Sequence, residues 1–123
     1  MSFILVAIGG ALGSVFRYSI GILFSSFSLT TFPWGTLFVN ITGSFLMGIV
    51  FFISKDFLSE EFKLFLSVGL LGGYTTFSAF SLDVINMLFN RDYLLSILYI
   101  LSSVFISILF LLAGFLFIKF LNS

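Results

Sequence analysis

Four long apolar stretches alternate with three short polar connections along the chain. The apolar stretches cover residues 3–24, 35–53, 62–89 and 93–121. Each has about 20 residues or more, which is the length that an α-helix needs to cross the hydrocarbon core of a membrane. Apolar and polar residues do not alternate within them, which argues against the strands of a membrane β-barrel. The pattern therefore predicts an all-α integral membrane protein with four spans in one domain, residues 1–123.

The polar connections carry signals of helix ends. Pro33 precedes the second stretch and suits the first turn of a helix, where a missing N–H costs little. Ser59 followed by Glu60 and Glu61 is typical of a helix start, because acidic side chains favour the positive N-terminal end. Residues 90–92, Asn-Arg-Asp, predict the last turn.

Composition supports a membrane protein and excludes several kinds of chemistry. Hydrophobic residues make up 60% of the chain and charged residues 8%, whereas a soluble domain carries roughly 25% charge. Such a chain cannot cover its surface with polar groups in water, which disfavours a soluble domain, a disordered tail and a nucleic-acid-binding protein. The chain has no His and no Cys, so a Cys/His zinc site, a thiol redox site and a histidine base are excluded.

The basic residues are distributed almost evenly between the two sides of the predicted membrane. Four spans place both termini and the connection at residues 54–61 on one side. Three lysines lie on that side: Lys55, Lys63 and Lys119. Arg91 lies on the other side, and Arg17 is in the half of the first span nearer to it. Because Lys/Arg asymmetry sets orientation, this weak asymmetry leaves two alternatives, which are one orientation with cytoplasmic termini or insertion both ways round as an antiparallel dimer.

Small residues recur at four-residue spacing in three of the four stretches. The motifs are Gly9-x-x-x-Gly13, Gly10-x-x-x-Ser14, Ser44-x-x-x-Gly48 and Gly69-x-x-x-Gly73. This spacing allows two helices to approach closely. The motifs pack helices within one subunit or against a second one, and we expect at least one of them to serve a dimer contact.

Polar side chains inside the spans are informative because they are costly unless they face protein or water. Arg17 either snorkels to the interface or attracts an anion at an aqueous entrance. Asn40 either bonds to a neighbouring helix or offers an N–H group to an anion. Tyr99, Ser103 and Ser107 follow i+4 spacing and form one stripe of hydroxyls. The stripe either lines a path for an ion or bonds to the carbonyls of its own helix.

The third span holds the densest group of unusual residues. Gly72-Gly73 followed by Thr75 and Thr76 is poor material for a helix interior, so we predict a break there. A break frees backbone carbonyls that can hold a cation. Phe77 and Phe80 share a helix face beyond it. Their positive ring edges could contact a small dehydrated anion, or the rings could face lipid or core like most of the 20 Phe residues.

Asp83 is the one acidic residue well inside a span. It can pair with Arg17, bond to a hydroxyl group, or reach the membrane interface. A role in proton coupling would require it to lie deep in the bundle.

Taken together, these segments resemble the CrcB/Fluc family of fluoride channels over essentially the whole chain and in the family's order. The matching pieces are Gly9-Gly10-Ala11-Leu12-Gly13 running to Arg17-Tyr18, Gly35-Thr36-Leu37-Phe38-Val39-Asn40-Ile41-Thr42-Gly43, Gly72-Gly73-Tyr74-Thr75-Thr76-Phe77-Ser78-Ala79-Phe80-Ser81, and the Tyr99/Ser103/Ser107 stripe. The third segment is the most specific. The chain departs from the family at Ala79, where relatives usually have Thr or Ser, so one hydroxyl near the pore is missing.

The resemblance implies a channel in the cell membrane through which accumulated fluoride leaves passively. It implies an antiparallel, dual-topology homodimer with two pores and Arg17 near a vestibule. A structural Na⁺ at the dimer interface would be held by the backbone carbonyls of Gly72 and Thr75. The implied pore residues are Phe77, Phe80, Asn40, Tyr99, Ser103, Ser107, Thr76 and Ser78.

Three other functions are weaker alternatives. A small proton-coupled multidrug exporter also has four spans, but such transporters use an acid in the first span, where this chain has Arg17. A non-transporting membrane assembly subunit would need neither the hydroxyl stripe nor the break. An enzyme is the least favoured, because the chain offers no nucleophile–base pair.

Overall fold

The computed structural model describes residues 1–27 and 30–123, and every element in this part of the chain is helical. The elements are α1 (Ser2–Phe27), α2 (Trp34–Ile53), α3 (Glu60–Leu64), the π-helix η1 (Phe65–Leu71), α4 (Gly72–Tyr74), α5 (Phe77–Phe89) and α6 (Tyr93–Leu121). The four elements α3, η1, α4 and α5 together form the third span. Four helical segments are long and apolar enough to cross a membrane, which confirms the predicted multi-pass, all-α protein.

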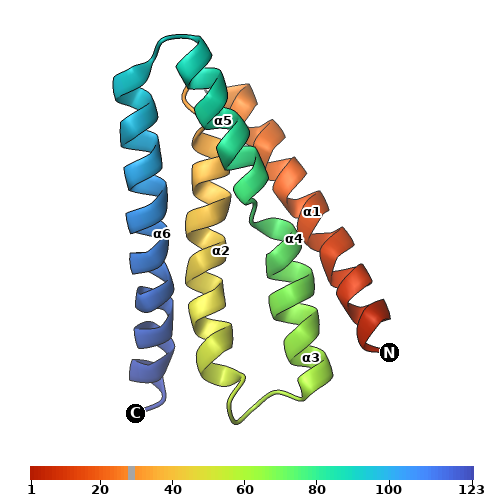
Figure 1. Cartoon of the computed structure of the whole chain (residues 1–123). Coiled ribbons are helices and arrows are strands. Elements are labelled where there is room, and N and C mark those ends of the chain that lie inside the picture. Colours follow the sequence, from red (N-terminus) through yellow and green to blue (C-terminus); the bar gives the residue numbers. More distant parts are fainter. Residues whose placement is uncertain (28–29) are drawn as a thin grey trace.

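Both chain ends and the connection between α2 and α3 lie at one end of the molecule (Figure 1). The turn between α5 and α6 lies at the other end. This arrangement confirms the prediction that the termini share a side. Arg91 in that distant turn has a φ of 61°, a left-handed conformation that is uncommon for residues other than glycine.

The third span changes its packing partner along its length. Its first half, α3 to α4, packs chiefly on α1, whereas α5 packs on α6. Helix α2 packs closely along α6. The packing partner of the third span changes from α1 to α6 at the junction of α4 and α5. Residues of three other helices therefore lie near this junction.

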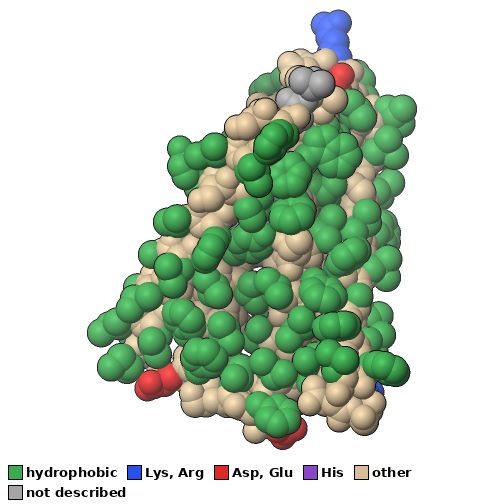
Figure 2. All heavy atoms as spheres, turned by 180° about the vertical axis from the view of Figure 1, so that it is seen from behind, with side chains coloured by type: hydrophobic (Ala, Val, Ile, Leu, Met, Phe, Trp, Pro, Cys, Tyr) green, Lys and Arg blue, Asp and Glu red, His purple; other side chains and the backbone are tan. Residues whose placement is uncertain are grey.

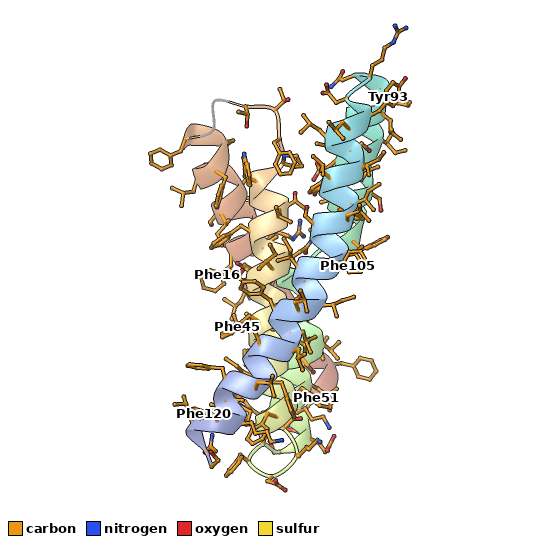
Figure 3. All side chains as sticks on the ribbon, turned by 90° about the vertical axis from the view of Figure 1, so that its left-hand side faces the viewer. Phe16, Phe45, Phe51, Tyr93, Phe105 and Phe120 are labelled. Atoms are coloured by element: carbon orange, nitrogen blue, oxygen red, sulfur yellow. The ribbon has the colours of Figure 1, made fainter. Side chains whose placement is uncertain are left out.

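Glycines bring α2 and α6 into backbone contact. A Cβ atom on Gly48 would lie 2.0 Å from the carbonyl oxygen of Leu111, and one on Gly114 would lie 2.0 Å from that of Phe45. Aromatic rings also pack between these helices: the ring of Phe45, which is labelled in Figure 3, lies 6.4 Å and 5.9 Å from those of Phe110 and Phe117. The glycine of Ser44-x-x-x-Gly48 therefore serves packing within one chain.

The contact between α1 and the third span is also made through glycine. A Cβ on Gly13 would lie 2.1 Å from the carbonyl oxygen of Leu70, and one on Gly73 would lie 2.6 Å from that of Gly10. The motifs that contain these residues are thus used inside the chain. Our expectation that one motif serves a dimer contact stays a prediction.

The surface of the molecule matches a lipid environment. In Figure 2 hydrophobic side chains cover the visible face from end to end, and the charged side chains gather at the two ends. Among the exposed hydrophobic residues are Phe3, Phe27, Phe89 and Phe120. An exposed apolar surface of this extent is uncommon on soluble proteins and is expected for helices that face lipid.

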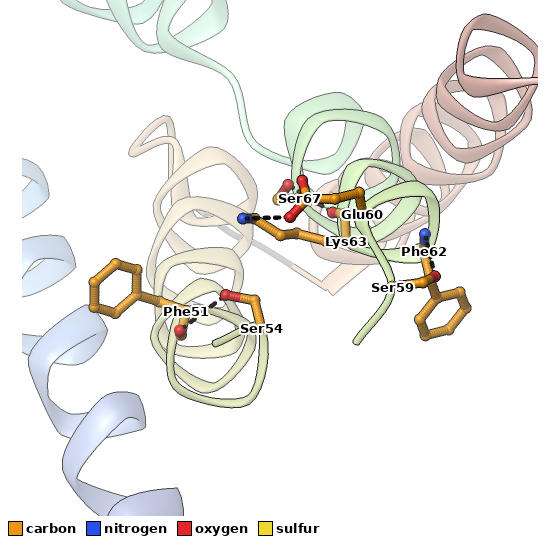
Figure 4. Close-up of polar contacts among 7 residues, drawn as sticks. All are labelled: Phe51, Ser54, Ser59, Glu60, Phe62, Lys63 and Ser67. Atoms are coloured by element: carbon orange, nitrogen blue, oxygen red, sulfur yellow. Dashed lines mark hydrogen bonds and ion pairs between the residues drawn. The ribbon is translucent and has the colours of Figure 1, made fainter. Parts of the chain in front are cut away.

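The start of the third span confirms the predicted helix signal at Ser59. Its hydroxyl accepts a hydrogen bond from the backbone N–H of Phe62 at 3.2 Å, and Glu60 lies 3.7 Å from Lys63 (Figure 4). That ion pair is solvent-exposed and contributes little. Pro33 stands one residue before α2 rather than in its first turn, a position where its missing N–H is equally harmless.

Candidate functional site

The break in the third span lies at two threonines. Helix α4 ends at Tyr74, Thr75 and Thr76 are extended, with ψ of 159° and 120°, and α5 begins at Phe77. The hydroxyl of Thr76 accepts from the backbone N–H of Ala79 at 3.1 Å and so caps α5. The predicted break between 72 and 76 is confirmed.

The paired glycines remain helical, contrary to their expected part in the break. No glycine in the described residues has a positive φ, and Gly72 has φ −64° and ψ −36°. Gly73 instead lets the backbone of α1 approach, because a Cβ there would meet Gly10. The glycines therefore provide space, and the threonines provide the change of direction.

Side chains from the first two spans satisfy the backbone around the break. Asn40 on α2 accepts the N–H of Thr76 through Oδ1 at 2.8 Å and donates from Nδ2 to the carbonyl of Thr76 at 3.0 Å. The Thr42 and Tyr74 hydroxyls lie 2.8 Å apart. Arg17 on α1 donates from Nε to the carbonyl of Gly73 at 3.2 Å. The predicted bond from Asn40 to a neighbouring span is therefore observed, and it uses only one of the two amide N–H groups.

Three carbonyl oxygens near the break keep free lone pairs. Among the hydrogen bonds around the break in the described residues, none is accepted by the carbonyl oxygens of Gly72, Tyr74 or Thr75. The N–H of Thr75 and its hydroxyl both bond to the carbonyl of Leu71. Free carbonyls in a membrane are costly unless they meet protein, water or an ion.

A groove of about 360 Å³ lies beside the break, between α2, α5 and α6. It brings together most of the predicted site residues: Asn40, Thr75, Thr76, Phe77, Phe80, Ser103 and Ser107. The groove contains no charged residue. The arrangement thus combines backbone, amide and hydroxyl groups with two aromatic rings on an otherwise apolar wall.

Two features of this groove make it suitable for a small polar ligand. The Ser103 side chain is only 7% exposed, and its hydroxyl has no hydrogen-bond partner among the described residues. A buried hydroxyl without a partner is uncommon and calls for a ligand or water. The rings of Phe77 and Phe80 lie 5.3 Å apart, with Phe77 76% exposed and Phe80 buried.

Tyr99 lies behind the groove instead of on its wall. The side chain is fully buried, and its hydroxyl donates to Oδ2 of Asp83 at 2.9 Å. Its ring lies 5.1 Å from that of Phe80. Of the three predicted alternatives for Asp83, a bond to a hydroxyl is the one observed. Ser102, on another face of α6, bonds to the carbonyl of Tyr99 in its own helix.

Arg17 lines a second pocket near the break. This pocket has a volume of about 550 Å³ and shares Thr76 with the groove. Ala79 lines this pocket and not the groove, so a residue at position 79 borders the pocket that Arg17 also lines. Ser78 lines neither cavity, and its hydroxyl lies 3.2 Å from that of Thr76.

Sequence reasoning missed several residues of the site. Ser44 and Met47 line the groove, and their spacing of four and seven from Asn40 could have placed them on its helix face. The contact between Thr42 and Tyr74 joins two different spans, so no spacing within one helix could have indicated it.

Comparisons with known proteins agree with this architecture. The sequence model of the family described as CrcB-like protein, Camphor Resistance (CrcB), matches residues 4–115. The fluoride-specific ion channel FluC of Rhizobium meliloti (strain 1021) is 50% identical over 113 residues, which cover 90% of each chain. The FluC proteins of Agrobacterium fabrum and Thermus thermophilus are 52% and 43% identical, covering 89% and 92% of this chain and 90% and 91% of theirs. The chain belongs to the CrcB family.

Proposed function

We propose that this protein is a fluoride-specific ion channel that lets fluoride leave the cell passively. The observation that carries the proposal is the buried hydroxyl of Ser103, which has no partner among the described residues and lies in an uncharged groove beside two Phe rings. The similar relatives carry the name fluoride-specific ion channel. A channel of this kind needs no catalytic residue, and the proposed activity is not enzymatic.

The chemistry of the groove suits a small, strongly hydrated anion. Fluoride can lose its water only where other donors replace it. Asn40 uses one amide N–H for Thr76 and keeps the second, while Ser103 and Ser107 add hydroxyls and the rings add positive edges. No cation lines the groove, so fluoride would be bound without being trapped. The proposed pore residues are Phe77, Phe80, Asn40, Thr76, Ser78, Tyr99, Ser103 and Ser107, and Arg17 is the proposed vestibule residue.

The groove also supports an antiparallel homodimer with two pores. Asn40, Thr75 and Ser107 line the groove and are partly exposed, so they would meet lipid in an isolated chain, where polar groups are costly. A second copy would cover them. The weak Lys/Arg asymmetry is consistent with insertion in both orientations.

A structural Na⁺ at the dimer interface fits the free carbonyls of the break. The backbone carbonyls of Gly72 and Thr75 would hold it, and carbonyl oxygens are suitable ligands for such ions. In an antiparallel dimer, the C-terminal end of α4 would face the same end of the second copy, and both ends carry negative partial charge. The ion would supply the positive charge that offsets this repulsion.

The deciding experiment is efflux from liposomes measured with ion-selective electrodes. Purified protein should release fluoride and retain chloride. Equal release of both ions, or release of neither, would refute the proposal. Release of neither would favour an assembly subunit.

A pair of variants tests whether Phe80 is a pore residue. Phe80→Ile should reduce fluoride efflux roughly tenfold, because the loss of one ring edge costs about 1.4 kcal/mol, and it should leave the oligomeric state unchanged in size-exclusion chromatography. The control is Phe105→Ile on the exposed surface of α6, which should leave efflux unchanged. Equal efflux from both variants would remove the pore role from Phe80.

A further inference from the structure

Helix α2 meets the break residue by residue. Thr42 contacts Tyr74 through its hydroxyl, and Asn40 bonds to Thr76. Gly43, which follows Thr42, gives space to Thr75, because a Cβ on Gly43 would lie 2.3 Å from the Thr75 methyl carbon. The segment Asn-x-Thr-Gly in α2 is therefore shaped to fit the segment Tyr-Thr-Thr of the third span.

The Asn40 contact has the form of a strand pairing. Thr76 is extended, with φ −155° and ψ 120°, and an extended residue points its N–H and C=O to the same side. A side-chain amide offers one acceptor and a donor in one plane, so it complements both groups at once. Asn40 thereby holds Thr76 in the extended conformation that interrupts the helix.

Arg17 acts on the other side of the break. Its Nε donates to the carbonyl of Gly73, one of the carbonyls that a helix end leaves without an internal partner. Asn40 and Arg17 together satisfy the carbonyls of Thr76 and Gly73. The carbonyls that remain are those of the residues between them and of Gly72.

We propose that Asn40 and Arg17 are positioning residues that fix the break and thereby select which carbonyls are free to bind the cation. The part that concerns the cation rests on the proposed function, whereas the effect on the break does not. Asn40 then serves the channel mainly through the Thr76 peptide, and only its second N–H remains for an anion.

Hydrogen–deuterium exchange of the full-length protein tests the clamp on Thr76. In Asn40→Ala the backbone N–H of Thr76 should exchange about tenfold faster or more, because a buried donor loses its acceptor. Asn122→Ala is the control, since that amide bonds only to the exposed end of α6 and should leave Thr76 unchanged. Exchange at Thr76 in Asn40→Ala that equals the parent overturns the proposal.

Two further measurements keep the proposal testable if Asn40→Ala does not fold. Asn40→Gln retains the amide on a longer side chain, which cannot reach both groups of Thr76 in register, so it should show the same faster exchange. In the parent, the N–H of Thr76 should exchange more slowly than that of Ser78, for which the described structure shows no bond across the break. Faster exchange at Thr76 than at Ser78 overturns the clamp.

Thermal unfolding in NaCl and in N-methylglucamine chloride tests the selection of carbonyls. The parent should unfold at a higher temperature in Na⁺, and Asn40→Ala and Arg17→Met should lose most of this difference. Arg91→Met, in the distant turn, is the control and should keep it. Retention of the full difference in Arg17→Met overturns the role of Arg17, whereas a parent without any difference overturns the sodium assignment and leaves the exchange result at Thr76 intact.

Discussion

Replacing Gly48 with alanine should separate α2 from α6 and destabilise the protein strongly. The new Cβ would lie 2.0 Å from the carbonyl oxygen of Leu111, 2.8 Å from the backbone N of Phe115 and 3.0 Å from the carbonyl carbon of Leu111. All three are backbone atoms of a continuous helix, so no side-chain rotation can relieve the contact. Each of these distances is shorter than an ordinary van der Waals contact, and the helices must therefore move apart.

The size of the effect follows from what is lost when the helices separate. Overpacking a well-packed contact costs about 1–3 kcal/mol, and a rigid backbone on both sides places Gly48→Ala at the upper end, about 3 kcal/mol. The contact is reciprocal, because Gly114 meets the carbonyl of Phe45 in the same way. A shift of α6 also moves Ser103 and Ser107 away from Asn40, so fluoride efflux should fall together with stability.

Equilibrium unfolding in mixed micelles at one fixed protein concentration measures this loss. The matched control is Gly21→Ala in α1, where a Cβ meets nothing within 4 Å. That change should be neutral or stabilise by about 0.5–1 kcal/mol, since alanine favours a helix more than glycine does. A free energy of unfolding for Gly48→Ala within about 0.5 kcal/mol of the parent would refute the reasoning.

Two further predictions concern single side chains. Ser103→Ala should leave the free energy of unfolding unchanged or raise it by about 1 kcal/mol, because it removes a buried hydroxyl without a partner, yet it should lower fluoride efflux from liposomes; a marked loss of stability would contradict this. Arg91→Gly should raise the free energy of unfolding by about 0.5–1 kcal/mol, because glycine adopts a φ of 61° without strain. A lower unfolding temperature for Arg91→Gly would show that the Arg91 side chain stabilises the turn.

The four spans could be predicted because membrane insertion depends on local composition. Residues 93–121 are apolar enough to identify the fourth span from the sequence alone. The break was predicted too, but its mechanism was not. Gly72 and Gly73 could permit either a turn or a close contact, and only the position of α1 against Gly73 shows that contact is their role.

The sequence could predict which site residues share a face of one helix, but not how the faces of different helices meet. Asn40, Phe80 and Ser103 do lie on one groove. Tyr99 shares the spacing of Ser103 and Ser107 but lies behind Phe80, because its partner Asp83 belongs to another span. Sequence spacing shows on which face of its own helix a side chain lies. It does not show which residue of another helix that side chain contacts.

The break accounts for both the groove and the free carbonyls. The third span packs on α1 before Thr75 and on α6 after Thr76, while α2 packs closely along α6. The change of partner leaves a space beside α6, which Phe80 lines together with Ser103, Ser107 and Leu111 of α6. The same two threonines that end one helix also border this space. The proposed cation ligands and the proposed anion path therefore both depend on this one interruption, and substitutions at Asn40 should affect both.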